Sequence, residues 1–225
     1  MTDTQKPLSW IGAIDKPVGI SSYDVIRELK HVLPPKTKIG HGGTLDPLAS
    51  GILVIGIGKA TKQLSTFLLG TDKEYVTTVE LGAWSESDDA EGPIHIVDAA
   101  QKPSLDEVEF ALQHFVGTIQ QRPPAYSAVK IGGKPAYEHA RDGKKVEIAE
   151  KTITIDAIKL ISYKYPYIEF SVACKSGVYI RSLARDLGEK LGTRGYVTAL
   201  RRTRVGEYTE DKALTLEKAK NFFKS

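Results

Sequence analysis

Cysteine is almost absent from this chain, because Cys174 is the only one among its 225 residues. A single cysteine cannot form an intrachain disulfide, nor can it build a zinc site of the usual multi-thiolate kind. Long apolar runs are absent too, since no stretch approaches the roughly 20 apolar residues that a membrane helix requires. The first residues, MTDTQKPLSW, lack the basic and then apolar segments of a signal peptide. We therefore expect a cytoplasmic protein with no membrane segment and no metal site.

The motifs of several enzyme classes are missing as well. The sequence contains no HExxH, no GxSxG and no GxGxxG. The segment Gly56–Thr61 hints at a phosphate-binding loop, but Leu53 stands where the first glycine of that motif belongs. Ala60 stands where a hydroxyl must reach magnesium. These departures exclude a P-loop NTPase.

A large excess of one charge sign is also lacking, since the net charge is only +3. The distribution of the charges says more than their sum. Residues 190–204 carry basic side chains and no acidic ones, and the segment 122–151 is also rich in bases. Local groups of bases can neutralise phosphates even when the total charge is small. From composition alone, a solvated charged surface is the commoner explanation.

Strand and helix patterns are mixed without a regular βαβ order, which favours an α+β fold with a largely antiparallel sheet. Capping boxes at Ser21/Asp24 and Ser104/Glu107 mark the starts of two helices. Residues 120–143 are loop-rich and resemble an insertion. Strands are predicted at Trp10–Ile14, Leu53–Ile57, Glu74–Leu81, Thr152–Ser162 and Tyr167–Lys175, with an extended segment at Tyr196–Tyr208. Helices are predicted at Ser21–Leu33, Lys62–Leu69, Ser104–Phe115, Tyr179–Leu191 and Thr215–Phe223.

Acidic residues gather in the predicted loop Trp84–Pro93, where Asp88, Asp89 and Glu91 lie close together in sequence. Such a group suggests a magnesium site. The spacing is not that of an EF-hand loop, however, and an acidic turn between two strands is the simpler interpretation.

A glycine-rich segment carries the main chemical signal: Lys38-Ile-Gly-His41-Gly-Gly-Thr-Leu-Asp46-Pro47-Leu-Ala-Ser-Gly51-Ile-Leu-Val. Glycines let the backbone approach a ligand closely. Pro47 stiffens the chain after Asp46, and the buried strand that follows gives this carboxylate a rigid base. Taken alone, an aspartate in such a loop is usually a turn residue.

This segment resembles the signature of the TruB family of pseudouridine synthases, usually written GHxGTLDPxAxGxLxxxxGxAT. One departure is Gly42, which stands where the family commonly has threonine. Further segments resemble the family's motifs in the right order: Asp15–Ser22, Asp72–Tyr75, Gln121–Lys130, Gly133–Gly143, Cys174–Gly188 and Leu200–Gly206. Together the matches cover most of the chain and are far more specific than any one motif.

The resemblance implies the pseudouridine synthase fold, in which helices flank a largely antiparallel mixed central sheet and an RNA-clasping insertion covers 120–150. It also implies an activity, the isomerisation of a T-loop uridine of tRNA, position 55 in standard tRNA numbering. The base would be flipped out, its N-glycosidic bond cleaved, and the base re-attached through C5. This chemistry involves no redox or phosphoryl transfer step, so no cofactor is expected. The expected partner is the T-stem loop of tRNA, and we expect a monomer without an obligatory protein partner.

Three residues match the family's catalytic positions. The resemblance gives Asp46 the role of the catalytic carboxylate, and leaves open whether it acts as a nucleophile or as a base. Tyr75 would stack on the flipped uracil and help to remove the C5 proton of the rotated base. Arg181 would pair with Asp46 and keep it ionised. Without the resemblance, Tyr75 reads as strand packing and Arg181 as a solvated helix arginine.

Five more residues match substrate-binding positions. His41 would hold the nucleotide near its flipped position, and Asp89 would contact that nucleotide. Tyr179 and Leu200 would line the uracil pocket, while Lys16 would steady the loop or touch RNA. Each has an ordinary alternative: a structural loop histidine, an acidic turn, core packing for the pocket residues, and a surface lysine.

We expect residues 1–225 to form a single catalytic domain, without the C-terminal RNA-binding domain of longer family members. The alternative function is an RNA-binding, tRNA-folding module without catalysis. That module predicts a missing carboxylate, tyrosine or arginine, whereas all three are present. A guide-RNA-dependent relative would need extra terminal domains for its protein partners, for which this chain has no room.

Overall fold

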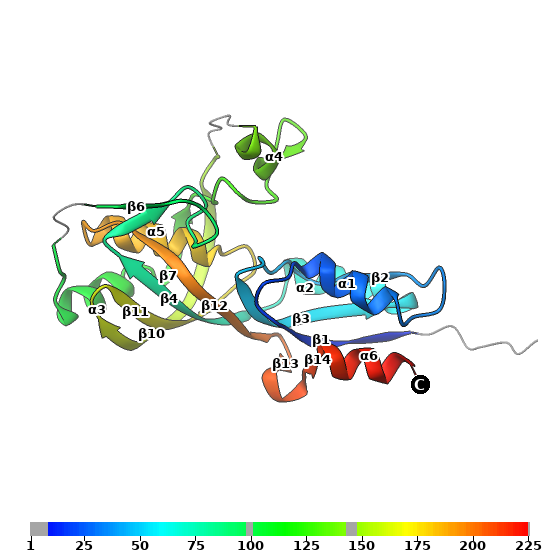
Figure 1. The fold of residues 1–225 in the computed structure, drawn as a ribbon. Helices are drawn as coiled ribbons and strands as arrows, with labels where there is room; N and C mark the ends of the chain where they lie inside the picture. Colours follow the sequence, from blue (N-terminus) through cyan, green and yellow to red (C-terminus); the bar gives the residue numbers. More distant parts are fainter. Residues whose placement is uncertain (1–8, 98–100, 143–147, 225) are drawn as a thin grey trace, which may run out of the picture. The chain divides into compact units, whose positions relative to one another are not determined.

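A computed structural model describes residues 9–97, 101–142 and 148–224 of the chain (Figure 1). The chain divides into two compact units. The first unit comprises Met1–Tyr75 and Leu200–Ser225, and the second comprises Val76–Ala199. Strand β4 (Lys73–Leu81) carries the chain from the first unit into the second, and strand β12 (Gly195–Val205) carries it back.

The secondary structure follows the sequence patterns closely. The strands are β1 (Trp10–Lys16), β2 (Ile39–His41), β3 (Ala49–Ile57), β4 (Lys73–Leu81), β5 (Ala83–Ser85), β6 (Ile94–Ile96), β7 (Gly117–Gln121), β8 (Lys130–Ile131), β9 (Lys134–Pro135), β10 (Lys151–Lys164), β11 (Tyr167–Cys174), β12 (Gly195–Val205), β13 (Tyr208–Thr209) and β14 (Leu214–Thr215). The helices are α1 (Ser22–Lys30), α2 (Leu64–Leu69), α3 (Leu105–Gln113), α4 (Ala136–Arg141), α5 (Ile180–Lys190) and α6 (Leu216–Lys224), with short 3-10 turns at Gly58–Gln63 and Glu210–Lys212.

Ten strands share one hydrogen-bonded sheet, whose main path runs β14-β1-β3-β12-β4-β11-β10-β7. Strand β2 pairs with β3, and β13 pairs with β12. The pairs β1/β3, β2/β3, β10/β11 and β7/β10 are antiparallel, whereas β1/β14 and β3/β12 are parallel. The predicted α+β class with a largely antiparallel mixed sheet is therefore confirmed.

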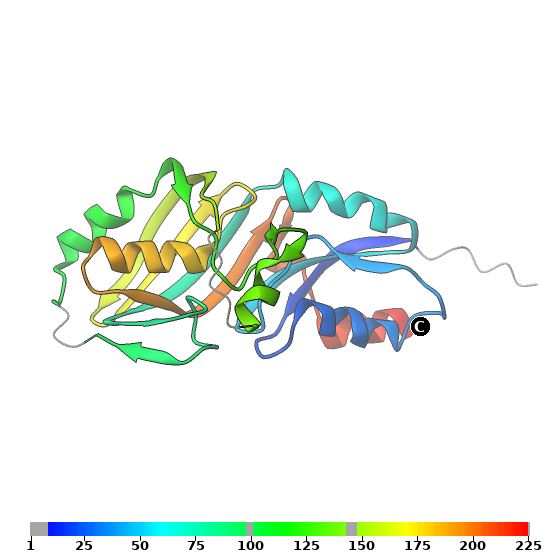
Figure 2. The ribbon, with the colours of Figure 1, turned by 90° about the horizontal axis from the view of Figure 1, so that it is seen from above.

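The first unit is built around β3, whose residues are almost all buried. It pairs with β1 in an unbroken register from Trp10↔Ile57 to Lys16↔Gly51. Helices α1 and α6 lie side by side (Figures 1 and 2). The Nζ of Lys220 on α6 pairs with Glu28 on α1 at 2.6 Å. A hydrophobic core cluster of this unit consists of Ala13, Ile52, Val54, Leu64 and Val205.

The second unit places α3 against β10 and α5. The inward side of α5 is apolar, with Ile180, Leu183, Ala184 and Leu187 buried. Both predicted capping boxes are present, at Ser21 before α1 and at Ser104 before α3. These reciprocal bonds satisfy backbone donors that a helix start otherwise leaves unpaired.

Two segments predicted as loops contain short regular elements. The segment 84–93 begins within β5 and leads to β6, and these two strands pair as a hairpin with Trp84 opposite His95. In the predicted insertion, β8 and β9 form a second hairpin, followed by α4. Figure 1 shows α4 standing apart from the sheet strands of its unit. No helix within the described ranges has the length and apolar character to cross a membrane.

Candidate active site

Asp46 lies in the turn between β2 and β3, in the first unit. The turn is closed by backbone bonds, since the Ala49 amide donates to the Asp46 carbonyl at 3.0 Å. The Gly19 amide donates to the Pro47 carbonyl at 2.8 Å, which ties the turn to the segment after β1. The chain on both sides of the Asp46 carboxylate is thus held by neighbouring segments.

Ser22 fixes the residue just before Asp46. Its hydroxyl donates to the Leu45 carbonyl at 3.0 Å and accepts from the Leu45 amide at 2.8 Å. Ser22 and Leu45 are both buried. Since buried backbone groups without a partner are costly, this one hydroxyl satisfies two groups at the base of the aspartate.

Arg202 of β12 supports the same turn from the other side, and it is only 2% exposed. Its guanidinium donates to the carbonyls of Ile52 at 2.7 Å, Gly43 at 3.1 Å and Thr44 at 3.3 Å. Gly51 permits this close packing of β3 on β12. It adopts a φ of +100°, and a Cβ there would come within 2.2 Å of the Arg202 carbonyl oxygen.

His41 ends β2 at the edge of this turn. Burial lowers the pKa of its imidazole, and the nearby positive charge of Arg202 lowers that pKa further. Its Nδ1 is buried without a hydrogen-bond partner among the described residues. The ring is thus biased toward the neutral form.

Lys16 is fully buried, so the alternative of a surface lysine is wrong. Its Nζ donates to the carbonyls of Pro17 at 2.9 Å and Ile20 at 2.6 Å. These bonds hold the turn between β1 and α1, from which Gly19 reaches Pro47. Tyr75 on β4 and Leu200 on β12 are 8% and 9% exposed, respectively, and their roles toward uracil stay predictions.

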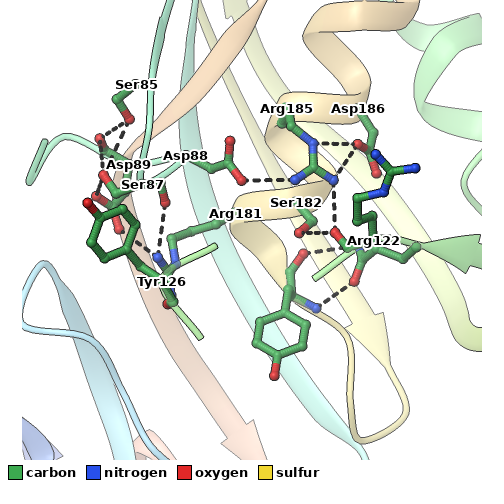
Figure 3. Close-up of polar contacts among 12 residues, drawn as sticks. Ser85, Ser87, Asp88, Asp89, Arg122, Tyr126, Arg181, Ser182, Arg185 and Asp186 are labelled. Atoms are coloured by element: carbon green, nitrogen blue, oxygen red, sulfur yellow. Dashed lines mark hydrogen bonds and ion pairs between the residues drawn. The ribbon is translucent and has the colours of Figure 1, made fainter. Parts of the chain in front are cut away.

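Arg181 and Asp89 form a buried pair in the second unit (Figure 3). Arg181 Nη1 lies 3.3 Å from Asp89 Oδ2, with side-chain exposures of 8% and 2%. The same guanidinium donates to the Ser87 carbonyl at 3.0 Å and to the Tyr126 carbonyl at 2.9 Å. The alternative of a solvated helix arginine is therefore wrong. Arg181 on the polar side of α5 faces the loop that contains Ser87 and Asp89 and not the solvent.

Asp89 is held on its second oxygen as well. The Ser87 hydroxyl and the Glu91 amide donate to Oδ1 at 2.6 Å and 3.0 Å. Such bonds to both oxygens orient the carboxylate. The acidic turn predicted here is thus a buried network.

Tyr179 caps the start of α5 and is bound by Gln121 in a reciprocal pair. The Tyr179 amide donates to Gln121 Oε1 at 2.9 Å, and Gln121 Nε2 donates to the Tyr179 carbonyl at 3.1 Å. The backbone of Tyr179 is therefore fixed at the end of β7, where the insertion begins.

A second arginine of α5, Arg185, was not among the residues predicted for the site. Arg185 Nη1 lies 3.0 Å from Asp88 Oδ2, and its Nε donates to Asp186 at 2.9 Å. Burial raises the pKa of Asp88 to about 6, against the opposing effect of the Arg185 and Arg181 charges. The only sequence signal was the four-residue spacing of Arg181 and Arg185, which puts both on one helix face.

The predicted site residues therefore gather in two groups. The first unit holds Lys16, His41, Asp46, Tyr75 and Leu200, and the second holds Asp89, Tyr179 and Arg181. The pairing of Arg181 with Asp46 joins the two groups and stays a prediction. The part of the chain that the structure describes contains no group of three or more His, Cys, Asp or Glu side chains arranged to hold a metal ion.

Comparison with solved structures places the fold. A chain in the crystal structure of a Cbf5-Nop10-Gar1 complex superposes with a TM-score of 0.73 at 30% identity. The match covers 95% of this chain and 54% of the other, so the present chain spans about half of that protein's length. The fold is that of the pseudouridine synthases.

Comparison with protein families and individual relatives identifies the chain more narrowly than its fold does. The TruB family pseudouridylate synthase N-terminal domain matches residues 30–180, and the tRNA pseudouridylate synthase B C-terminal domain matches 181–224. A protein named tRNA pseudouridine synthase B from Corynebacterium diphtheriae is 45% identical over 91% of this chain and 70% of its own. Its namesake from Parabacteroides distasonis is 42% identical over 92% of this chain and 90% of its own. The chain belongs to the TruB family of pseudouridylate synthases.

Proposed function

We propose that this protein converts a T-loop uridine of tRNA, position 55, to pseudouridine. The observation that carries the proposal is an aspartate in the family's signature loop whose backbone is fixed on both sides. Before the aspartate, Ser22 binds Leu45, and Arg202 binds Gly43 and Thr44. After it, the Gly19 amide donates to the Pro47 carbonyl. A carboxylate that attacks or deprotonates the ribose must be held rigidly by the surrounding backbone, because catalysis is sensitive to small displacements of the reacting group.

In the proposed reaction, Asp46 serves the ribose as either nucleophile or base. The N1–C1′ glycosidic bond breaks, the uracil rotates, and C5 bonds to C1′. Tyr75 stacks on the base and helps to remove the C5 proton, while Arg181 keeps the carboxylate ionised. The reaction is an internal rearrangement in which the proton lost from C5 is balanced by one gained at N1, so no cofactor is required.

The remaining predicted residues bind the extruded nucleotide. His41 holds it near the flipped position, Asp89 contacts it, and Tyr179 and Leu200 line the uracil pocket. The Nδ1 of His41, which has no hydrogen-bond partner among the described residues, and the fixed carboxylate of Asp89 are compatible with these roles. Lys16, whose ammonium is bound to two carbonyls, steadies the segment beside the catalytic turn.

The proposed partner is the T-stem loop of tRNA. The insertion at 120–150 would close over it, and exposed bases such as Lys130 and Lys134 would meet its phosphates. We propose further that the protein acts as a cytoplasmic monomer with one catalytic domain and without an obligatory protein partner.

The test is incubation of the purified protein with an unmodified T-arm stem-loop, followed by chemical mapping of pseudouridine. Wild-type protein is expected to convert the single T-loop position, and Asp46→Asn to convert none while still binding the RNA. Asp106→Asn, an equal change at an exposed site on α3, serves as the control and should retain full activity. Binding without any product from the wild type would favour the tRNA-folding module. Undiminished product from Asp46→Asn would remove Asp46 from catalysis.

A further inference from the structure

Helix α5 binds two separate segments of the second unit at once. Its residues Arg181 and Arg185 lie one turn apart and point to the same side of the helix (Figure 3). One of these segments is the loop 87–89, which contains Asp89. The other is the chain just after β7, residues 121–126, where the insertion leaves the sheet. We call this second segment the insertion root.

The guanidinium of Arg185 binds three different protein groups. Its Nη1 meets Asp88 at 3.0 Å, and its Nε and Nη2 meet Asp186 Oδ1 at 2.9 Å and 2.8 Å. Nη2 also donates to the Arg122 carbonyl at 2.9 Å. The planar fork of arginine suits such divided binding, which lysine cannot reproduce. Arg185 therefore joins the Asp88 loop to the insertion root through a single side chain.

Neighbouring residues of α5 hold the same root. The Ser182 hydroxyl donates to the Arg122 carbonyl at 2.8 Å, so that carbonyl accepts two bonds from the helix. Arg181 reaches the Tyr126 carbonyl, and the backbone of Tyr179 is bound by the Gln121 amide. The root is thus bonded to α5 at three places, all of them within six residues.

Beyond the root, the insertion builds a small structure of its own. The Tyr137 amide donates to the Ser127 carbonyl at 3.1 Å, and the Ala136 amide donates to the Val129 carbonyl at 2.7 Å. These bonds fold the β8–β9 hairpin and α4 back on Ser127. The insertion root therefore leads directly into this small structure, whose first bonded residue is Ser127.

Burial makes the Arg185 contacts more durable than ordinary surface pairs. The side chains of Arg185 and Asp88 are 22% and 11% exposed, whereas the Arg122–Glu150 pair is 57% and 52% exposed at 3.5 Å. Exposed pairs contribute little because water and salt screen them. The partly buried Arg185–Asp88 pair is therefore less screened than the Arg122–Glu150 pair.

We propose that Arg185 is a positioning residue for RNA binding, which locks the insertion root to the loop that carries Asp89. The inference rests on the proposed function, in which the insertion closes over the T-stem loop. A root fixed in advance spares the RNA the cost of ordering it, and this preorganisation raises affinity without a direct contact to the RNA. Arg185 would then govern how tightly RNA binds, whereas Arg181 would govern how fast it reacts.

The first test is Arg185→Gln, assayed for T-arm affinity and for single-turnover conversion at saturating RNA. We expect about tenfold weaker binding, or about 1.4 kcal/mol, with the conversion rate within about twofold of wild type. Arg27→Gln is the matched control. Arg27 pairs with Asp24 at 2.8 Å but is 60% exposed and lies on α1, so the same charge loss there should leave both quantities unchanged.

Two further readouts separate positioning from a phosphate contact and from general destabilisation. Arg185 is occupied by protein groups, so the slope of log K against log salt should stay at the wild-type value. Amide hydrogen exchange of residues 121–126 in the free protein should accelerate in Arg185→Gln, while the exchange of β3 amides should not. A reduced salt slope, or unchanged exchange at the root, would overturn the proposal.

Asp88→Asn provides an independent check, because it keeps the shape of the side chain. It should weaken RNA binding in the same direction as Arg185→Gln, and the double variant should lose less than the sum of the two losses. Strict additivity would overturn the link between Asp88 and Arg185, as would a conversion rate that falls as far as affinity. Failure of the proposed function would look different, since the wild type itself would then form no pseudouridine.

Discussion

The Ser22 hydroxyl and the backbone of Leu45 form a closed pair of hydrogen bonds one residue before Asp46. Ser22 belongs to the first turn of α1, whereas Leu45 lies in the turn between β2 and β3. The pair therefore couples the start of α1 to the turn that holds the proposed catalytic carboxylate, 23 residues away in sequence.

Replacing Ser22 with alanine should slow catalysis more than it weakens RNA binding. The change leaves the buried amide and carbonyl of Leu45 without this partner, a loss of about 1–3 kcal/mol in unfolding free energy. Single-turnover rates should fall at least tenfold, with T-arm affinity close to wild type. Ser104→Ala is the control, since it removes the helix cap of α3 at a cost of about 1 kcal/mol far along the chain from the turn. Equal rates for the two variants would separate Ser22 from catalysis.

Arg202→Lys should destabilise the protein more than any conservative arginine change on the surface. A lysine keeps the charge but cannot reach the carbonyls of Gly43, Thr44 and Ile52 together, so buried acceptors lose donors. We expect a loss of about 2–4 kcal/mol in urea denaturation. Arg204→Lys, two residues along β12, alters a partly exposed pair with Glu74 and a bond to the Gly206 carbonyl, and it should change stability by less than about 1 kcal/mol. Similar losses for both variants would contradict the role assigned to Arg202.

Local features were the most predictable from sequence. The capping boxes at Ser21 and Ser104 depend on residues three positions apart, and both are present. The α+β class followed from the irregular mixture of strand and helix patterns, and the sheet confirms it. The Asp46 loop was identifiable because its residues are contiguous and match a long family signature.

Long-range polar contacts were not predictable in the same way. Helical spacing put Arg181 on the polar side of α5, which is correct, but spacing alone does not say what that side meets. It meets Ser87 and Asp89, some ninety residues earlier, so the arginine is buried and not solvated. Arg202 is buried by the same means, since the carbonyl group of Ile52 from a distant segment binds its charged end, whereas the carbonyls that bind the buried Lys16 are close to it in sequence. Hydrogen bonds that satisfy a buried charge in this way depend on the fold, and no periodic pattern in the sequence predicts them.

Asp88 should give the protein a distinctive pH dependence of stability. Its pKa is raised to about 6 in the folded protein, chiefly by burial and further by Asp186, with Arg185 and Arg181 opposing. An unfolded aspartate titrates near a pKa of roughly 3.9, so between these values the folded state binds the extra proton. The contribution of Asp88 to unfolding free energy is therefore full below pH ~4 and is lost as pH rises through about 6.

Urea denaturation of wild type and Asp88→Asn over this pH range measures that contribution, because other titrating groups cancel in the difference. The wild type should lose up to about 3 kcal/mol relative to the variant between pH ~4 and ~7. A difference that stays constant, or that grows in favour of the wild type as pH rises, would contradict the raised pKa of Asp88.

Lys130 and Lys134 should contact RNA phosphates, in contrast to Arg185. Both are exposed on the β8–β9 hairpin of the insertion. If each neutralises one phosphate, the double change Lys130→Ala/Lys134→Ala releases two fewer counterions and reduces the salt slope of T-arm binding by about 1.4–1.8. Lys159→Ala/Lys175→Ala, which removes the same charge from exposed positions on and just after the β10–β11 hairpin, is the control and should leave the slope unchanged. An unchanged slope in the hairpin variant would remove β8 and β9 from the RNA interface, whereas a reduced slope in both variants would indicate a general charge effect.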